Sequence, residues 1–144
     1  MFEGISMVDY FSATLSDDER RAMSSIGLAH VGDAVYELLV RTYLCVHGKA
    51  TGKSLHRATV ALVCAPKQAE LSEKLLPLLT EEERDVFRRG RNANVHTIPR
   101  SADRMEYQKA TALEALLGYL YLKGEKERVN ALFNAMMEEK SDVT

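Results

Sequence analysis

Two carboxylates lie in helical segments where a charge is costly, and together they could bind a metal ion. Asp33 lies in residues 26–44, IGLAHVGDAVYELLVRTYL, and Glu114 lies in residues 110–122, ATALEALLGYLYL. Apolar residues cover nearly every face of both segments, which predicts two buried helices. A buried charge is unfavourable unless it is paired or bound to a metal. The two acids are therefore the first candidates for a catalytic site.

Glycines mark the place where these two helices could cross. Gly32 precedes Asp33, and Gly118 follows Glu114 by one helical turn. A glycine inside a helix costs about 1 kcal/mol relative to alanine, so a closely approaching backbone would explain both. A crossing there would bring the acids together. Mg²⁺ binds to one or two carboxylates plus waters and phosphate oxygens, and it activates water for phosphodiester hydrolysis. The alternative is that each acid is protonated or caps a neighbouring helix.

The same residues resemble the ribonuclease III family. GDAVYELLVRTYL is similar to the signature helix of that family, and TALEALLGYLYL is similar to its second acidic helix. The short form of the family, Mini-ribonuclease III, is more similar still, over most of residues 28–122. The resemblance implies an all-α, ribonuclease III-type helical endonuclease domain that forms a homodimer. It also implies that Asp33 and Glu114 are the catalytic metal ligands.

The resemblance further implies an activity and a substrate. The expected activity is Mg²⁺-dependent endoribonucleolytic cleavage of double-stranded RNA that leaves 5′-phosphate ends, with Mn²⁺ as a substitute for Mg²⁺. The expected role is the maturation of precursor large-subunit (23S) ribosomal RNA. That substrate follows from the resemblance alone, because no residue of the sequence selects it.

Two acids of the larger family are absent. Ala29 stands four residues before Asp33, and Thr111 stands three residues before Glu114, where the larger family has carboxylates. The short form lacks them as well. Thr111 is a candidate for orienting a metal ligand. Glu37, one turn after Asp33, is another. Glu37 also precedes Arg41 by four residues, which favours a helix ion pair instead.

Residues 88–100 form a basic run without Asp or Glu. Double-stranded RNA is recognised mostly through phosphates and 2′-hydroxyls, which suits arginine and asparagine. RRGRNA also resembles the RNA-binding loop of the short form. The alternative is that the arginines only balance the acids of residues 81–85. The candidate RNA contacts in this run are Arg88, Arg89, Arg91, Asn92 and Arg100.

A second basic cluster lies at the start of an expected helix and contains Lys53, His56 and Arg57. It is either a further RNA contact or an ordinary surface turn. His30, next to Ala29, is expected in the core, with metal binding as the alternative. His47 and His96 show no metal-ligand spacing.

Length and composition indicate one globular domain over residues 1–144, with a core at about 24–140. The chain has 144 residues, 46% of them hydrophobic and 28% charged, and a net charge of -2. A nucleic-acid site must therefore be a local basic patch, and a separate double-stranded RNA-binding domain has no room. Cys45 and Cys64 are isolated, as in reduced cytoplasmic proteins. No apolar run has membrane-spanning length, and the first residues lack the basic region of a signal peptide.

The expected elements are all helices, because no segment alternates like a strand. Ser54, Pro66 and Asp103 mark helix starts, as does the Thr80–Glu83 capping box. Gly48 and Gly90 are expected to end the preceding helices. The helices are predicted at about 25–47, 55–63, 66–76, 81–89, 103–124 and 125–139, with a short amphipathic helix within residues 1–15 and a loop over 90–100.

Two other functions fit part of this pattern. A non-catalytic double-stranded RNA-binding module of the same fold is favoured by the missing acids and opposed by the retention of Asp33 and Glu114. A helical protein-interaction domain with structural acids is the other. The two acidic helices have more apolar surface than a small interior covers, which predicts a two-fold interface between copies.

Overall fold

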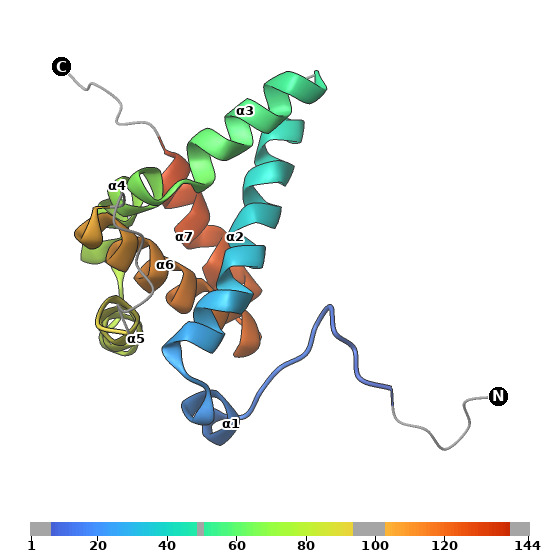
Figure 1. Cartoon of the computed structure of the whole chain (residues 1–144). Coiled ribbons are helices and arrows are strands. Elements are labelled where there is room, and N and C mark those ends of the chain that lie inside the picture. The colour runs from blue at the N-terminus through green and yellow to red at the C-terminus, as the bar shows by residue number, and fades with distance from the viewer. Residues whose placement is uncertain (1–6, 49–50, 94–102, 139–144) are drawn as a thin grey trace.

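The structure, a computed structural model, describes residues 7–48, 51–93 and 103–138. These ranges contain helices and no strand, so the all-α prediction is confirmed for them (Figure 1). None of the helices in these ranges is long and apolar enough to cross a membrane. The elements are α1 (Asp17–Ala22), α2 (Ser25–Val46), α3 (Gly52–Val63), α4 (Ala65–Leu75), the 3-10 turn η1 (Leu76–Leu78), α5 (Glu81–Arg91), α6 (Arg104–Leu122) and α7 (Lys126–Met137).

Helices α2 and α6 cross at their glycines, as the sequence predicts. A Cβ atom at Gly32 would lie 1.6 Å from the backbone oxygen of Glu114. A Cβ atom at Gly118 would lie 2.0 Å from the backbone oxygen of Leu28. Both distances are far shorter than any contact between a real Cβ atom and an oxygen, so the two backbones can approach this closely only because both residues are glycine.

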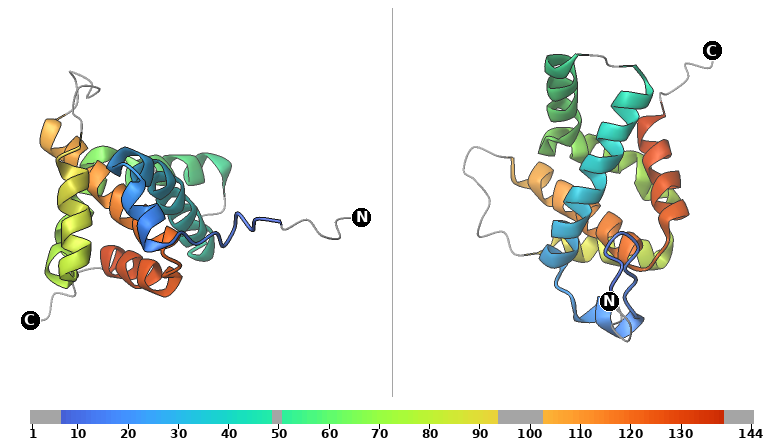
Figure 2. Two further views of the ribbon diagram at one scale, coloured as in Figure 1. Left: turned by 90° about the horizontal axis from the view of Figure 1, so that it is seen from below. Right: turned by 90° about the vertical axis from the view of Figure 1, so that its right-hand side faces the viewer.

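Helix α6 is the centre of the fold. It packs against α2, α4, α5 and α7 (Figure 2), which explains why its apolar residues cover nearly every face. Leu113, Leu116 and Leu117 are fully buried. The neighbouring helices contribute the rest of the main cluster, which includes Tyr36, Val40, Leu71, Leu75, Phe87, Leu132, Phe133 and Met136.

Helix α2 is not buried on every face, and that prediction is wrong for a single copy of the chain. Ile26, Leu38 and Val46 are 50%, 66% and 75% exposed. His30, expected in the core, is also exposed. The reason is that α2 packs mainly on α6 and on α3, and these two helices leave its opposite side open. Asp33 is also exposed on α2.

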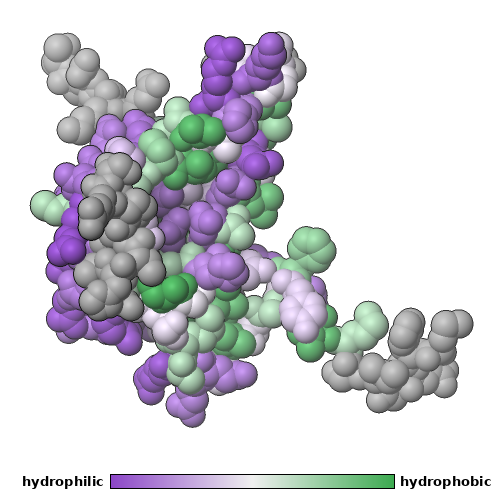
Figure 3. Space-filling model, viewed as in Figure 1, coloured by the Kyte–Doolittle hydropathy of each residue, from purple (hydrophilic) through white to green (hydrophobic). Residues whose placement is uncertain are grey.

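The N-terminal segment differs from the prediction as well. Residues 7–15 contain no helix, and Met7, Val8, Tyr10 and Phe11 are exposed, so the expected amphipathic helix is absent there; residues 1–6 lie outside the described residues. Figure 3 shows apolar residues of this segment standing clear of the body. The segment joins α6 through the Leu15 amide, which donates to the Leu122 carbonyl at 2.7 Å.

Two helix boundaries have a different cause from the one expected. Thr51, not Ser54, caps α3, because its side chain accepts a hydrogen bond from the Ser54 amide. Gly90 does not end α5 but lies inside it. A Cβ atom at Gly90 would lie 2.9 Å from the Cα of Ala112, so this glycine permits α5 to approach α6. Gly48 and Gly124, with φ of 80° and 84°, follow the ends of α2 and α6.

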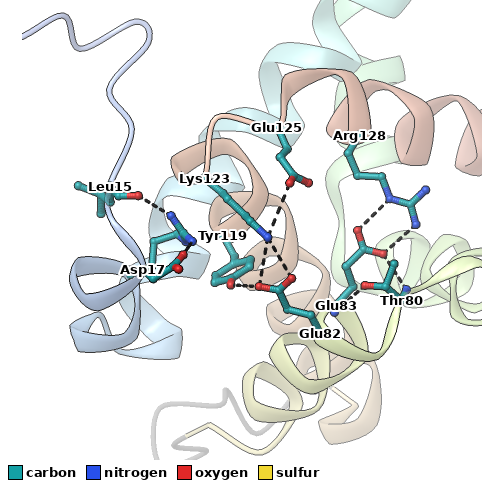
Figure 4. A network of polar contacts seen from close by, with 10 residues as sticks. Leu15, Asp17, Thr80, Glu82, Glu83, Tyr119, Lys123, Glu125 and Arg128 are labelled. Atoms are coloured by element: carbon teal, nitrogen blue, oxygen red, sulfur yellow. Dashed lines mark hydrogen bonds and ion pairs between the residues drawn. The ribbon is translucent and has the colours of Figure 1, made fainter.

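A polar network holds α5 in place against α6 and α7 (Figure 4). Glu83 closes the capping box with Thr80 at the start of α5, as predicted. It also accepts two hydrogen bonds from Arg128 of α7, at 2.7 and 2.8 Å, and these bonds hold the pKa of Glu83 below its usual range. Lys123 donates to Glu82 at 3.0 Å. The Arg128–Glu83 and Lys123–Glu82 contacts together fix the orientation of α5, and with it the position of the basic C-terminal turn of this helix.

Candidate active site

The side chains of Asp33 and Glu114 meet at the crossing of α2 and α6. Asp33 is exposed, and Glu114 is partly buried. Gly32 lies against the backbone of Glu114, so the residue that follows it on α2 is placed beside the Glu114 side chain. The two carboxyls are hydrogen-bonding neighbours. The glycines of the two helices predicted that the acids meet where the helices cross, and the structure brings them together there.

The surroundings of Glu114 disfavour its charged form. Burial raises its pKa to about 8, and the hydrogen bond and negative charge of Asp33 add to that increase. Protonated Glu114 can donate to the Asp33 carboxylate, which favours the neutral form of Glu114 at neutral pH. A divalent cation between the two oxygens would reverse this preference, since a bound cation is the largest local charge in such a site.

Gln68 of α4 is a third polar group at this site. Its side chain is buried, and its Nε2 donates to Oε2 of Glu114 at 3.4 Å and to the Val63 carbonyl at 2.8 Å. This contact acts against the pKa increase of Glu114, because it favours the charged carboxylate. Gln68 was not among the site residues predicted from the sequence. The signal was a polar residue at helical spacing with the buried Leu71 and Leu75.

Tyr36 is a buried residue next to these groups. It lies about one turn after Asp33 on α2, is fully buried, and donates from its hydroxyl to the Leu62 carbonyl at 2.7 Å. Burial raises the pKa of its hydroxyl, with smaller contributions from Cys64 and Glu114. The hydrogen bond ties the end of α3 to α2. The α3–α4 junction, which leads to Gln68, is therefore fixed relative to Asp33.

The donor set fits a hard divalent cation. Within the described residues, no group of three or more His, Cys, Asp or Glu side chains could hold a metal ion. The oxygens available are those of two carboxylates and one carboxamide. Mg²⁺ prefers oxygen ligands, keeps several waters, and needs only one or two protein carboxylates. The site lacks the histidine and thiolate ligands that zinc prefers.

The two residues proposed to orient metal ligands differ in their contacts. Glu37 pairs with Arg41 at 3.2 Å, which matches the structural alternative for this acid. Thr111 is partly buried on α6, one turn before Glu114. Its backbone oxygen would lie 3.5 Å from a Cβ atom at Gly90, so this part of α6 faces α5.

The basic turn of α5 lies beside the turn of α6 that carries Glu114. Gly90 contacts Ala112 and Ala115, which flank Glu114. Arg91 and Asn92 follow Gly90 and are exposed, and Arg91 has no ion pair with any described residue. Arg91 is thus the arginine of this turn that is most available to a polyanion.

The other candidate RNA contacts vary in their surroundings. Arg88 and Arg89 both pair with Asp85, the latter at 3.1 Å, so part of their charge is balanced as the alternative predicted. Lys53, His56 and Arg57 are exposed on the first two turns of α3. Arg100 and His96 lie outside the described residues. Cys45 and Cys64 are free thiols, as predicted.

Comparison with known proteins gives a consistent result. Residues 27–125 match the Ribonuclease III domain. The chain is 48% identical over 108 residues to Mini-ribonuclease 3 of Symbiobacterium thermophilum, covering 75% of this chain and 83% of that protein. It is 39% identical over 135 residues to Mini-ribonuclease 3 of a Thermoanaerobacter species, covering 92% and 95%.

A solved structure is also similar to this chain. The crystal structure of a Fusobacterium nucleatum protein superimposes with a TM-score of 0.73 at 34% identity, covering 81% of this chain and 93% of that one. The matched domain, residues 27–125, contains both acids of the site as well as Gln68 and the basic turn of α5.

Proposed function

Because the chain belongs to the ribonuclease III family and is an endoribonuclease, we propose that Asp33 and Glu114 hold a Mg²⁺ ion with which it hydrolyses double-stranded RNA. The observation that carries the proposal is the glycine crossing, which places the two acids side by side. Two carboxylates held this close together repel each other when both are charged. A cation bound by both would offset this repulsion. Mn²⁺ offers similar oxygen coordination and would substitute.

The residues of the site have distinct roles in this proposal. When bound, Mg²⁺ supplies an activated water and charge stabilisation for the leaving oxygen. Asp33 is exposed and can reach a cation that also contacts an RNA phosphate. Glu114 is more buried and is held by Gln68. Glu114 must lose its proton to bind the cation, so metal binding is coupled to proton release.

The RNA is bound through its backbone in this proposal. Arg91 and Asn92 follow Gly90, which packs on α6 next to Glu114, and Arg88, Arg89, Arg100, Lys53, His56 and Arg57 are the further proposed contacts. The net charge of the chain is -2, which confines RNA binding to these local patches. Contacts of this type read the shape of a duplex more than its sequence.

Assembly and substrate complete the proposal. The exposed apolar residues of α2, Ile26, Leu38 and Val46, support a homodimer in which each copy cuts one strand and leaves a 5′-phosphate. We propose precursor 23S ribosomal RNA as the natural substrate and the cytoplasm as the location, by analogy with the family. Glu37 and Thr111 are secondary candidates for orienting the metal ligands.

The direct test is cleavage of a labelled RNA duplex by the purified chain with Mg²⁺, with Mn²⁺, and with EDTA. We expect products with 5′-phosphate ends in both metals and none in EDTA. Tight duplex binding without cleavage in either metal would contradict the proposal and favour the non-catalytic RNA-binding module. Neither binding nor cleavage would favour the protein-interaction domain.

A further inference from the structure

Gln68 has a buried carbonyl oxygen that the fold itself does not use. The residue is 3% exposed, and its Oε1 atom has no hydrogen-bond partner among the described residues. A buried acceptor without a donor costs about 1–3 kcal/mol. Such atoms are rare in folded proteins, and each one calls for a physical explanation.

The orientation of the amide follows from its partners. The Val63 carbonyl, at 2.8 Å, can only accept a hydrogen bond, so the nitrogen of Gln68 must face it. The second N–H of the same nitrogen is directed to Oε2 of Glu114, at 3.4 Å. Both donors are therefore in use. Oε1, on the same amide group, is the atom that lacks a partner among the described residues.

We propose that Gln68 is a positioning residue for the divalent cation, in which Nε2 orients Oε2 of Glu114 and Oε1 accepts a hydrogen bond from a cation-bound water. This inference rests on the proposed function. Mg²⁺ keeps several waters when bound to proteins, and a cation-bound water is a strong donor of the kind Oε1 lacks. Groups that orient metal ligands in this way typically contribute 10–100-fold to metal affinity or activity.

The alternative is a purely structural amide. Gln68 would then serve only to join the Val63 carbonyl to the first turns of α4. This role predicts a loss of stability on substitution but no change in metal affinity. The two roles are separated by measuring metal binding in the absence of RNA.

The test compares Gln68→Met with Ser72→Ala. Methionine keeps the length of the side chain and removes both hydrogen-bonding functions. Ser72 is a buried polar residue one turn further along α4, and its hydroxyl donates to the Ala69 carbonyl instead of the acid pair. Mn²⁺ binding to the RNA-free protein is measured by electron paramagnetic resonance at one neutral pH. We expect Gln68→Met to raise the Kd about 10–100-fold and Ser72→Ala to leave it unchanged.

An unchanged Mn²⁺ Kd for Gln68→Met, with wild-type binding intact, would overturn the role of Gln68 and leave the proposed function standing. Absence of Mn²⁺ binding in the wild type would overturn the proposed function and this inference together. A second variant, Gln68→Glu, keeps the volume and replaces the donor nitrogen by oxygen. It places a third carboxylate at the pair, so we expect lower metal-free stability and a larger Mn²⁺-induced rise in Tm than in the wild type. A rise no larger than that of the wild type would also overturn the inference.

Discussion

The backbone of Gly32 lies directly against the carbonyl of Glu114, and a Cβ atom at position 32 would come within 1.6 Å of that oxygen. This contact joins α2 and α6 next to Asp33 and at Glu114. The geometry of the site and the packing of the core therefore depend on the same few atoms. Substitutions at the crossing are expected to affect both stability and metal binding.

Gly32→Ala is expected to destabilise the chain severely. The added methyl group would overlap backbone, which cannot move aside as a flexible side chain would, so α2 and α6 must separate. Overpacking of this kind costs about 3 kcal/mol or more. Gly52→Ala is the matched control, because nothing lies within 4 Å of the added Cβ at this helical position. It should be neutral or slightly stabilising. Urea unfolding of both variants measures the effect, and a small loss for Gly32→Ala would refute the close approach.

The raised pKa of Glu114 predicts a pH dependence of stability in the metal-free chain. The folded state binds a proton on Glu114 up to about pH 8, whereas the unfolded state loses it near the ordinary value of 4.5. The folded state therefore holds more protons between these values, and the free energy of unfolding falls as pH rises through this window. The lowered pKa values of Glu82 and Glu83 act below it.

The measurement for this prediction is urea unfolding in EDTA at pH 5 and pH 8. The wild type should lose more stability across the window than Glu114→Gln, which cannot ionise at this position. Added Mg²⁺ should restore stability at the higher pH in the wild type alone. Equal pH dependence in the two proteins would show that Glu114 does not carry the effect.

Arg91→Ala tests the RNA contact. Loss of one phosphate contact should weaken binding similarly for all duplex sequences and lower the slope of log affinity against log salt by about one. Arg88→Ala is the matched comparison, since Arg88 already pairs with Asp85 on the same helix and should change the slope less. Filter binding over a series of salt concentrations gives both slopes. An unchanged slope with a lowered Tm for Arg91→Ala would indicate that this arginine is structural.

Leu38→Glu tests the homodimer. Leu38 is 66% exposed on the open side of α2, and a charge there should prevent the apolar contact between two copies. Val60→Glu on α3 is the control, because Val60 is also exposed and apolar but lies on another helix. Sedimentation should show a dimer for the wild type and the control, and a monomer for Leu38→Glu. A wild-type monomer at micromolar concentration would exclude the homodimer.

The sequence predicted the helices and their crossing well, because both depend on local signals. The Thr80–Glu83 capping box and the glycines of the two acidic helices are short-range patterns with one structural solution. Gly90 was misinterpreted because a glycine at the end of a basic turn resembles a helix stop. Its actual role depends on α6, more than twenty residues away in the chain.

Gln68, the exposed residues of α2 and the structure of residues 7–15 could not be predicted from local sequence patterns. Gln68 contacts Val63 and Glu114, which is 46 residues further along the chain, and a polar residue on the buried face of a helix does not by itself indicate which chemistry it serves. The apolar pattern of α2 did not show which of its residues lie outside the core, because an apolar residue that is exposed on a single copy has the same sequence pattern as a buried one. Residues 7–15 were misassigned because apolar content alone does not make a helix without partners to pack against.

Asp33 and Glu114 are proposed to form a metal-dependent catalytic pair. Asp33→Asn keeps the shape of the side chain and removes its charge. Glu37→Gln removes a charge one turn away that already pairs with Arg41, and it is the matched control. Both variants should retain duplex RNA binding in Ca²⁺.

The most direct measurement is the single-turnover rate of duplex cleavage in Mg²⁺ for the wild type and these two variants. We expect at least about a 100-fold loss for Asp33→Asn, the scale expected when a key electrostatic group is removed, and a far smaller change for Glu37→Gln. Cleavage by Asp33→Asn at the wild-type rate would contradict the claim and remove Asp33 from the mechanism.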